Sequence, residues 1–159
     1  MPEGHVTHRL AAEFNTCFGG RVVRVSSPQG RFADSAALLD GSVLGHAEAY
    51  GKHLFIGFEV AVPDPIVQIH LGLIGKLRLR PQAAPVGQVR LRISDGVLAA
   101  DLSGPQLCRL VSPGEQAAVM ATLGADPLRS DAAPQAAWSR IHASSRPIAA
   151  LLMDQQVTA

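Results

Sequence analysis

From Arg21 to Ser112 the sequence is divided into short segments of alternating apolar and polar residues, separated by frequent Gly and Pro. A period of two predicts half-buried strands, and the close spacing of turn residues excludes long helices here. The predicted strands cover residues 21–26, 42–50, 53–60, 66–71, 76–80, 88–94, 97–102 and 108–112. So many short strands are typical of an antiparallel β-sandwich or barrel.

A helix is predicted before these strands. Apolar residues recur at helical spacing over 6–17, and Gly19 and Gly20 then end the pattern. Pro2 suits the first helical position and Glu3 suits the first turn. We therefore expect one amphipathic helix at the N-terminus.

Helical patterns return after Ser112, over 115–123, over 135–144 and from Pro147 onward. The last pattern runs to Ala159 without a stop signal, so we expect the chain to end inside a motif. The predicted fold is α+β: an N-terminal helix and a two-layer antiparallel β-sandwich over 1–113, then a partial all-α domain over 114–159. The chain of 159 residues is long enough for one domain plus a fragment.

Composition limits the location and the partners. The longest apolar runs are too short to span a bilayer and the N-terminus lacks a secretory pattern, so we expect a cytoplasmic protein that binds no membrane. Cys17 and Cys108 stand far apart, and we expect both to be buried core thiols. The net charge is only +1, but twelve of the fourteen basic residues are arginines, which suit phosphate.

The first residues carry the most specific chemistry. A small second residue permits removal of Met1, which would leave the secondary amine of Pro2 free to attack a carbon and form an iminium. An α-amino group titrates near ~8 against ~10.4 for lysine, so more of it is unprotonated at neutral pH. Glu3 could move a proton at the reacting sugar. The alternative is structural, since proline and glutamate are ordinary residues at helix starts.

Two loops add candidates. Residues 50–53 predict a hairpin tip that holds Lys52 out from the sheet, where it could neutralise a phosphate or donate a proton; otherwise it is a solvated turn lysine. His70 could donate to a phosphate oxygen or satisfy a partner within the sheet. Leu73, in a loop after a strand, could replace an extruded base in a stack, or could simply be packed.

Two further patterns concern charge and metals. Arg78 and Arg80 share one strand face, as do Arg90 and Arg92, so neighbouring strands would form a ridge of four guanidinium groups along a phosphate backbone. The alternative is the polar face of a half-buried sheet.

A metal site is conceivable from four histidines, His5, His8, His53 and His70, although no carboxylate or cysteine nearby has ligand spacing. We therefore predict no metal.

Five stretches together resemble the formamidopyrimidine-DNA glycosylase and endonuclease VIII family. They are Met1-Pro2-Glu3-Gly4-His5 with His8-Arg9, Gly51-Lys52-His53-Leu54, His70-Leu71-Gly72-Leu73, Gly124-Ala125-Asp126-Pro127-Leu128 and the stretch from Pro147 to Gln155. Their order and spacing match throughout, and the fourth is similar to the family's link between two domains. Each motif is weak alone, but the set covers essentially the whole chain.

The resemblance implies a bifunctional base-excision-repair enzyme that extrudes a damaged base, cuts its glycosidic bond and breaks the strand by β/δ elimination. Pro2 would form the Schiff base, Glu3 would handle protons and Lys52 would contact phosphate and donate a proton. His70 would contact the backbone and Leu73 would fill the void. Damaged DNA would be the partner, and we expect a monomer.

Two departures from the family pattern shape the expectation. The branch that acts on oxidised purines carries Arg-Arg-Phe-Gly after an aspartate, whereas this chain has Leu102-Ser103-Gly104-Pro105 after Asp101. This favours the endonuclease VIII branch and oxidised pyrimidines. The family also continues past the equivalent of Ala159 with the rest of a helix-two-turn-helix region and a zinc finger. We thus expect an incomplete helix-two-turn-helix domain, no zinc finger and no cofactor in this chain.

Other function classes stay open at this point. The chain could be a non-catalytic DNA-binding or structural fragment whose N-terminus only caps a helix, or a small metal hydrolase that uses the histidines. A Schiff-base enzyme would become covalently linked to abasic DNA by borohydride even with chelators present. A binder would show only reversible, salt-sensitive retention.

Overall fold

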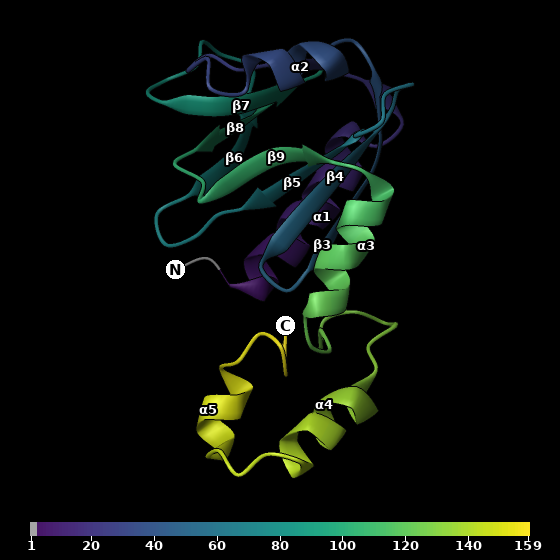
Figure 1. The fold of residues 1–159 in the computed structure, drawn as a ribbon. Coiled ribbons are helices and arrows are strands. Elements are labelled where there is room, and N and C mark those ends of the chain that lie inside the picture. The colour runs from purple at the N-terminus through teal and green to yellow at the C-terminus, as the bar shows by residue number, and fades with distance from the viewer. Residues whose placement is uncertain (1–2) are drawn as a thin grey trace.

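The computed structural model describes residues 3–159 and shows two antiparallel sheets flanked by helices, with the last two helices below them (Figure 1). The helices are α1 (Gly4–Phe18), α2 (Ala33–Leu39), α3 (Pro113–Thr122), α4 (Pro134–His142) and α5 (Ile148–Leu152). The strands are β1 (Arg21–Val22), β2 (Arg24–Ser26), β3 (Val43–Tyr50), β4 (His53–Glu59), β5 (Ile66–His70), β6 (Lys76–Pro81), β7 (Val89–Ser94), β8 (Leu98–Ser103) and β9 (Leu107–Val111). The predicted α+β class, with an N-terminal helix, antiparallel sheets and then further helices, is confirmed.

The strands form a five-stranded sheet in the order β1-β3-β4-β5-β9 and a four-stranded sheet in the order β2-β7-β8-β6. All pairs are antiparallel. The predicted strand 21–26 is divided at Val23, so that β1 joins one sheet and β2 joins the other. One continuous segment thus bridges both layers, which an alternating pattern by itself cannot reveal.

Helix α1 contributes one side of the core. Leu10, Phe14 and Phe18 recur at i, i+4 and i+8 and are almost fully buried against β3 and β4. The side chain of Asn15 bonds both backbone groups of Ala47: its Nδ2 donates to the carbonyl at 2.8 Å and its Oδ1 accepts from the N–H at 2.7 Å. This fixes the position of the helix along β3.

Several details correct the sequence interpretation. Glu3 is the N-cap residue of α1 and lies just before the first turn, because the helix begins at Gly4. Helix α2 was not predicted: seven residues are too short for a clear helical pattern, and packing against β2 supplies the missing support. The last predicted helix stops at Leu152 and does not reach Ala159. Cys17 and Cys108 are free and only partly buried.

The chain end returns toward the sandwich. Gly124 donates to the carbonyl of Gln155 at 2.8 Å, and Ala159 donates to the carbonyl of Ala125 at 3.0 Å. A side chain at Gly124 would overlap the backbone of Val157, because its Cβ would lie 2.2 Å from the carbonyl carbon. Among residues 3–159, no helix is both long and apolar enough to cross a bilayer.

Candidate active site

The tip of the β3–β4 hairpin lies against the start of α1. Tyr50 pairs with His53 and a two-residue turn separates them, with Gly51 at a φ of +54°. This left-handed backbone favours glycine, as the sequence interpretation expected for a hairpin tip. Lys52, the second turn residue, leaves the sheet, and its Nζ lies 2.9 Å from Oε2 of Glu3. The predicted hairpin therefore brings together two of the proposed catalytic residues.

Gly51 is held through both of its backbone groups. Oγ1 of Thr7 donates to its carbonyl at 2.6 Å, and its N–H donates to Oδ2 of Asp126 at 2.7 Å. Thr7 and Asp126 are each only 1% exposed, so water cannot replace either partner. Lys52 is thus the next residue after a fully anchored one, which limits where its ammonium group can reach.

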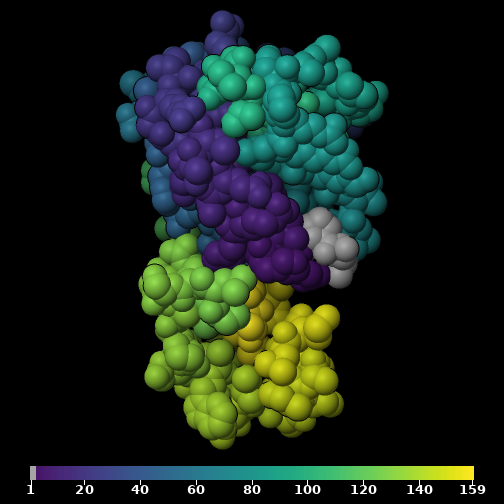
Figure 2. Space-filling model, turned by 180° about the vertical axis from the view of Figure 1, so that it is seen from behind, coloured from purple at the N-terminus to yellow at the C-terminus, as the bar shows by residue number. Residues whose placement is uncertain are grey.

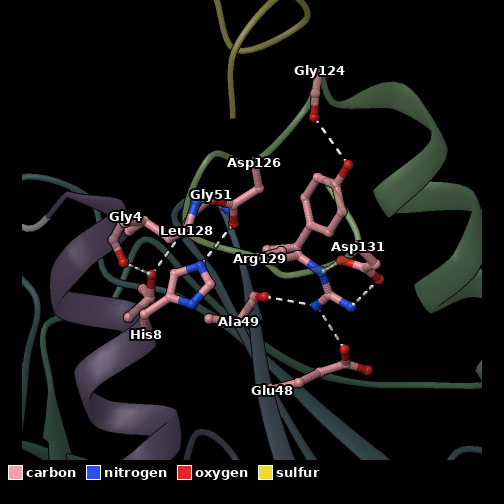
Figure 3. Close-up of polar contacts among 12 residues, drawn as sticks. Gly4, His8, Glu48, Ala49, Gly51, Gly124, Asp126, Leu128, Arg129 and Asp131 are labelled. Carbon is pink, nitrogen blue, oxygen red and sulfur yellow. Dashed lines mark hydrogen bonds and ion pairs between the residues drawn. The ribbon is translucent and has the colours of Figure 1, made fainter. Parts of the chain in front are cut away.

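Asp126 also accepts from Nε2 of His8 at 2.7 Å and from the N–H of Leu128 at 2.9 Å (Figure 3). One buried carboxylate therefore joins α1, the hairpin tip and the segment after α3. In the sequence Asp126 was only part of a predicted interdomain link. Its partner at position 51 lies 75 residues away, so no local pattern could have identified the contact.

A second cluster holds the same segment beside the hairpin. Nη1 of Arg129 lies 2.8 Å from Oε2 of Glu48 and donates to the carbonyl of Ala49 at 3.0 Å, while its Nε donates to Asp131 (Figure 3). The hydrogen bond with Asp131, assisted by Glu48, raises the pKa of the Arg129 guanidinium against the opposing effect of burial. The guanidinium also lies over the ring of Tyr50.

A pocket opens where Glu3 and Lys52 face the C-terminal segment. In Figure 2 the yellow end of the chain packs directly below the N-terminal end of the purple helix. The pocket is lined by Glu3, Gly4, Lys52, Leu152, Met153, Gln155, Thr158 and Ala159. An acid, a base and an amide therefore share one hollow with apolar side chains, an arrangement that suits proton transfer on a bound organic ligand.

Two histidines lie at the next strand ends. His53 and His70 are register partners, and their ring centroids are 4.9 Å apart. Burial, followed by the charges of His70 and Arg109, lowers the pKa of His53 to about 4. Burial and the Lys52 ammonium lower the pKa of His70, whereas a hydrogen bond with Gln106 raises it. Both rings are therefore neutral near pH 7.

The histidines do not gather as the metal-hydrolase hypothesis requires. His8 is paired with Asp126, while Nδ1 of His53 bonds the side chain of Gln68 at 3.1 Å. Nδ1 of His70 accepts from the N–H of Gly72. Within residues 3–159 no group of three or more His, Cys, Asp or Glu side chains could hold a metal ion.

The remaining predicted site residues do not form one group. Leu73 is 75% exposed in the loop between β5 and β6, so the packed alternative for this residue is wrong. Strand β8 lies between β6 and β7, so the predicted ridge of four arginines does not form. Arg90 bonds Gln29 and Arg92 is buried against Asp101, which leaves Arg78 and Arg80 as the exposed pair. Pro2 lies outside the described residues.

Comparison with known proteins identifies the family of this chain. Residues 1–102 match the family model described as the formamidopyrimidine-DNA glycosylase N-terminal domain. The chain belongs to the formamidopyrimidine-DNA glycosylase/endonuclease VIII family. "Endonuclease 8 1" of Mycobacterium bovis is 53% identical over 165 residues, covering 100% of this chain and 60% of its own length. "Endonuclease 8 2" of the same organism is 34% identical, covering 100% and 63%.

Solved structures of the family share the fold. The structure titled as MutM in complex with carbocyclic 8-oxo-G containing DNA has a TM-score of 0.76 at 18% identity, covering 99% of this chain and 62% of that one. The MutM (Fpg) protein from Thermus thermophilus has a TM-score of 0.68 at 25% identity, covering 100% and 58%. The chain thus spans about 60% of the length of the curated relatives it matches. Both of these sequence relatives are named endonuclease 8, in agreement with the predicted branch.

Replacing Asp126 by Ala is expected to lower the free energy of unfolding by about 3 kcal/mol. The change leaves the buried N–H of Gly51 without an acceptor and removes the partner of His8. Urea denaturation measures the loss. Asp131→Ala is the matched control, since it removes an exposed carboxylate from the same segment without touching the hairpin, and its effect should be much smaller. Equal losses in the two variants would contradict the anchoring role of Asp126.

Acidification should destabilise the protein through His53. Its pKa is about 4 in the folded chain and about 6.5 when unfolded. Between these values the unfolded state binds more protons than the folded state. The contribution of neutral His53 to the free energy of unfolding is therefore fully present above pH ~6.5 and is lost as the pH falls toward 4. Urea midpoints measured from neutral to acidic pH should fall less steeply for His53→Asn than for the wild type. The exposed His142→Asn variant should follow the wild type; parallel curves for all three proteins would refute this assignment.

Proposed function

We propose that this chain carries the catalytic half of a bifunctional DNA glycosylase and abasic-site lyase. In this proposal the amine of Pro2, freed by removal of Met1, attacks the sugar carbon that bears the damaged base. The observation that supports it most directly is the 2.9 Å contact between Lys52 and Glu3. Glu3 follows Pro2 directly in the sequence, so the proposed nucleophile is one residue away from a carboxylate that contacts a lysine ammonium group.

The proposed steps use these groups in order. The amine of Pro2 attacks the sugar carbon and displaces the base, which leaves with the amine proton. Glu3 then donates a proton to the ring oxygen as the bond from that oxygen to the same carbon breaks, which gives the iminium. Lys52 contacts the phosphate and donates a proton during the β/δ elimination that breaks the strand. The pair is partly exposed, with 27% of the Lys52 side chain and 38% of the Glu3 side chain accessible. A DNA strand can therefore reach both groups without a large rearrangement of the hairpin.

DNA binding in this proposal uses the neighbouring strand ends. His70 is the register partner of His53 next to the hairpin and directs a neutral ring to a backbone phosphate. Leu73 stands out from the following loop and fills the space of an extruded nucleotide. An exposed leucine next to an exposed isoleucine, Ile74, is costly in water. Contact with a base stack would remove that cost.

Oxidised pyrimidines are the proposed substrates. This rests on the names of the two relatives, endonuclease 8 1 and endonuclease 8 2, and on Leu102-Ser103-Gly104-Pro105 in place of the purine branch's Arg-Arg-Phe-Gly stretch. A non-catalytic DNA-binding role is the second candidate. It predicts DNA retention without a covalent product, which the following experiment separates.

Borohydride trapping on abasic or thymine-glycol duplex tests the nucleophile. Processed wild type should form a covalent adduct, because an iminium is reduced to a stable amine. Pro2→Gly and a form that retains Met1 should lose at least most of the adduct, since the secondary amine is absent or blocked. Intact mass must show which N-terminus each sample has. Adduct yields that are the same for free and blocked termini would exclude Pro2 as the nucleophile.

Glu3→Gln should separate the two reactions. Base removal needs a proton at the sugar, and loss of a general acid or base costs about 10²–10⁴-fold in rate. Strand cleavage at a preformed abasic site should fall much less. Single-turnover rates on thymine-glycol duplex and on abasic duplex measure the two steps, with Glu13→Gln, at a partly exposed position of α1, as the matched control. Equal losses of rate on both duplexes would contradict the proposed role of Glu3 in base removal.

A further inference from the structure

A second hollow lies on the outer face of the four-stranded sheet, away from the Glu3–Lys52 pocket. One wall is the row formed by Lys76, Arg78 and Arg80 along β6, and the other is the loop that follows this strand. Arg78 and Arg92 are both register partners of Asp101 on β8, which places the three on one face. Strand β6 is at the edge of its sheet (Figure 1), and the three side chains of the row are exposed.

The floor of this groove is built by a buried ion pair. Nε of Arg92 lies 3.0 Å from Oδ1 of Asp101, and Arg92 is only 8% exposed. The pair is close enough for strong attraction, although its angle is poor for a hydrogen bond. Nη2 of Arg92 also donates to the carbonyl of Ala83 at 2.6 Å, which fixes the loop over the groove. The guanidinium of Arg92 is therefore engaged by Asp101 and by the carbonyl of Ala83, and the charge of Asp101 is balanced by Arg92.

The row itself keeps its charge. Within residues 3–159, Lys76, Arg78 and Arg80 have no carboxylate in ion-pair contact, and all three are exposed. By contrast, Arg9, Arg21 and Arg24 each pair with an acid. Three neighbouring cations on one strand face repel one another, and a polyanion would relieve that repulsion.

We propose that the β6 row binds the phosphate backbone of duplex DNA flanking the lesion, as an extension of the DNA-binding surface beyond the reaction pocket. This rests on the proposed function. Strand β6 begins two residues after Ile74, in the loop that carries Leu73, and leads away from it. Alternate residues in a strand repeat every ~6.7 Å, so the row from Lys76 to Arg80 is about 13 Å long. That equals about four base-pair steps of duplex.

Charge neutralisation of this row gives the test. The variant Lys76→Gln/Arg78→Gln/Arg80→Gln removes three cations, and circular dichroism must confirm that it folds. Binding is measured to a duplex with a stable abasic-site analogue. Raising the salt from about 50 to about 200 mM should weaken wild-type binding about 40-fold more than variant binding, since three fewer phosphates are neutralised. Arg9→Gln/Arg21→Gln/Arg24→Gln is the matched control, with the same change in net charge, and should keep the wild-type salt slope.

A second arm varies the DNA. Lengthening one flank by single base pairs should raise wild-type affinity over about four added pairs, and the row variant should gain little. Equal salt slopes and equal flank dependence in wild type and variant would overturn the proposal. Competition by inorganic phosphate without any flank effect would also overturn it, because the groove would then take a free anion. Failure of wild type to trap abasic DNA would instead contradict the proposed function.

Discussion

The arrangement of the site depends on how Gly51 is held. Its carbonyl accepts from Thr7 on α1 and its N–H donates to Asp126, and both partners are buried. Three parts of the chain that are distant in sequence thus meet at one residue. Because a buried backbone group without a partner is costly, the hairpin, the helix and the segment after α3 are stabilised together.

This constraint explains why Lys52 and Glu3 are neighbours. Glu3 caps the start of α1, and Thr7 lies one turn further along the same helix. The bond from Thr7 to Gly51 therefore sets the distance between the helix start and the hairpin tip. The C-terminal segment closes the other side of the pocket through the bridge between Ala125 and Thr158. Glu3 and Lys52 thus stand on elements that buried hydrogen bonds hold together, which favours a defined geometry between the two side chains.

Positive charge is divided between two uses. Arg92 and Arg129 are engaged by carboxylates and backbone carbonyls, so they stabilise the sheet and the hairpin. The row of Lys76, Arg78 and Arg80 lies on an edge strand and, in the described part of the chain, forms no ion pair, because the nearby Asp101 is paired with Arg92. From sequence, the pair Arg78 and Arg80 was expected to form one ridge with the pair Arg90 and Arg92. Strand order prevents this, since β8 separates the two pairs and supplies the acid that neutralises Arg92.

The strand segments, the N-terminal helix, the turn at Gly51 and the family could all be predicted from the amino-acid order, because periodicity, glycine backbone freedom and ordered motifs are local properties of the chain. Helix α2 and the early end of α5 were missed, since such short segments take their stability from packing. The folded chain alone reveals that Asp126 binds Gly51, that β1 and β2 belong to different sheets and that Arg92 is occupied. Such contacts join residues that are far apart in sequence, and burial then determines which polar groups must pair.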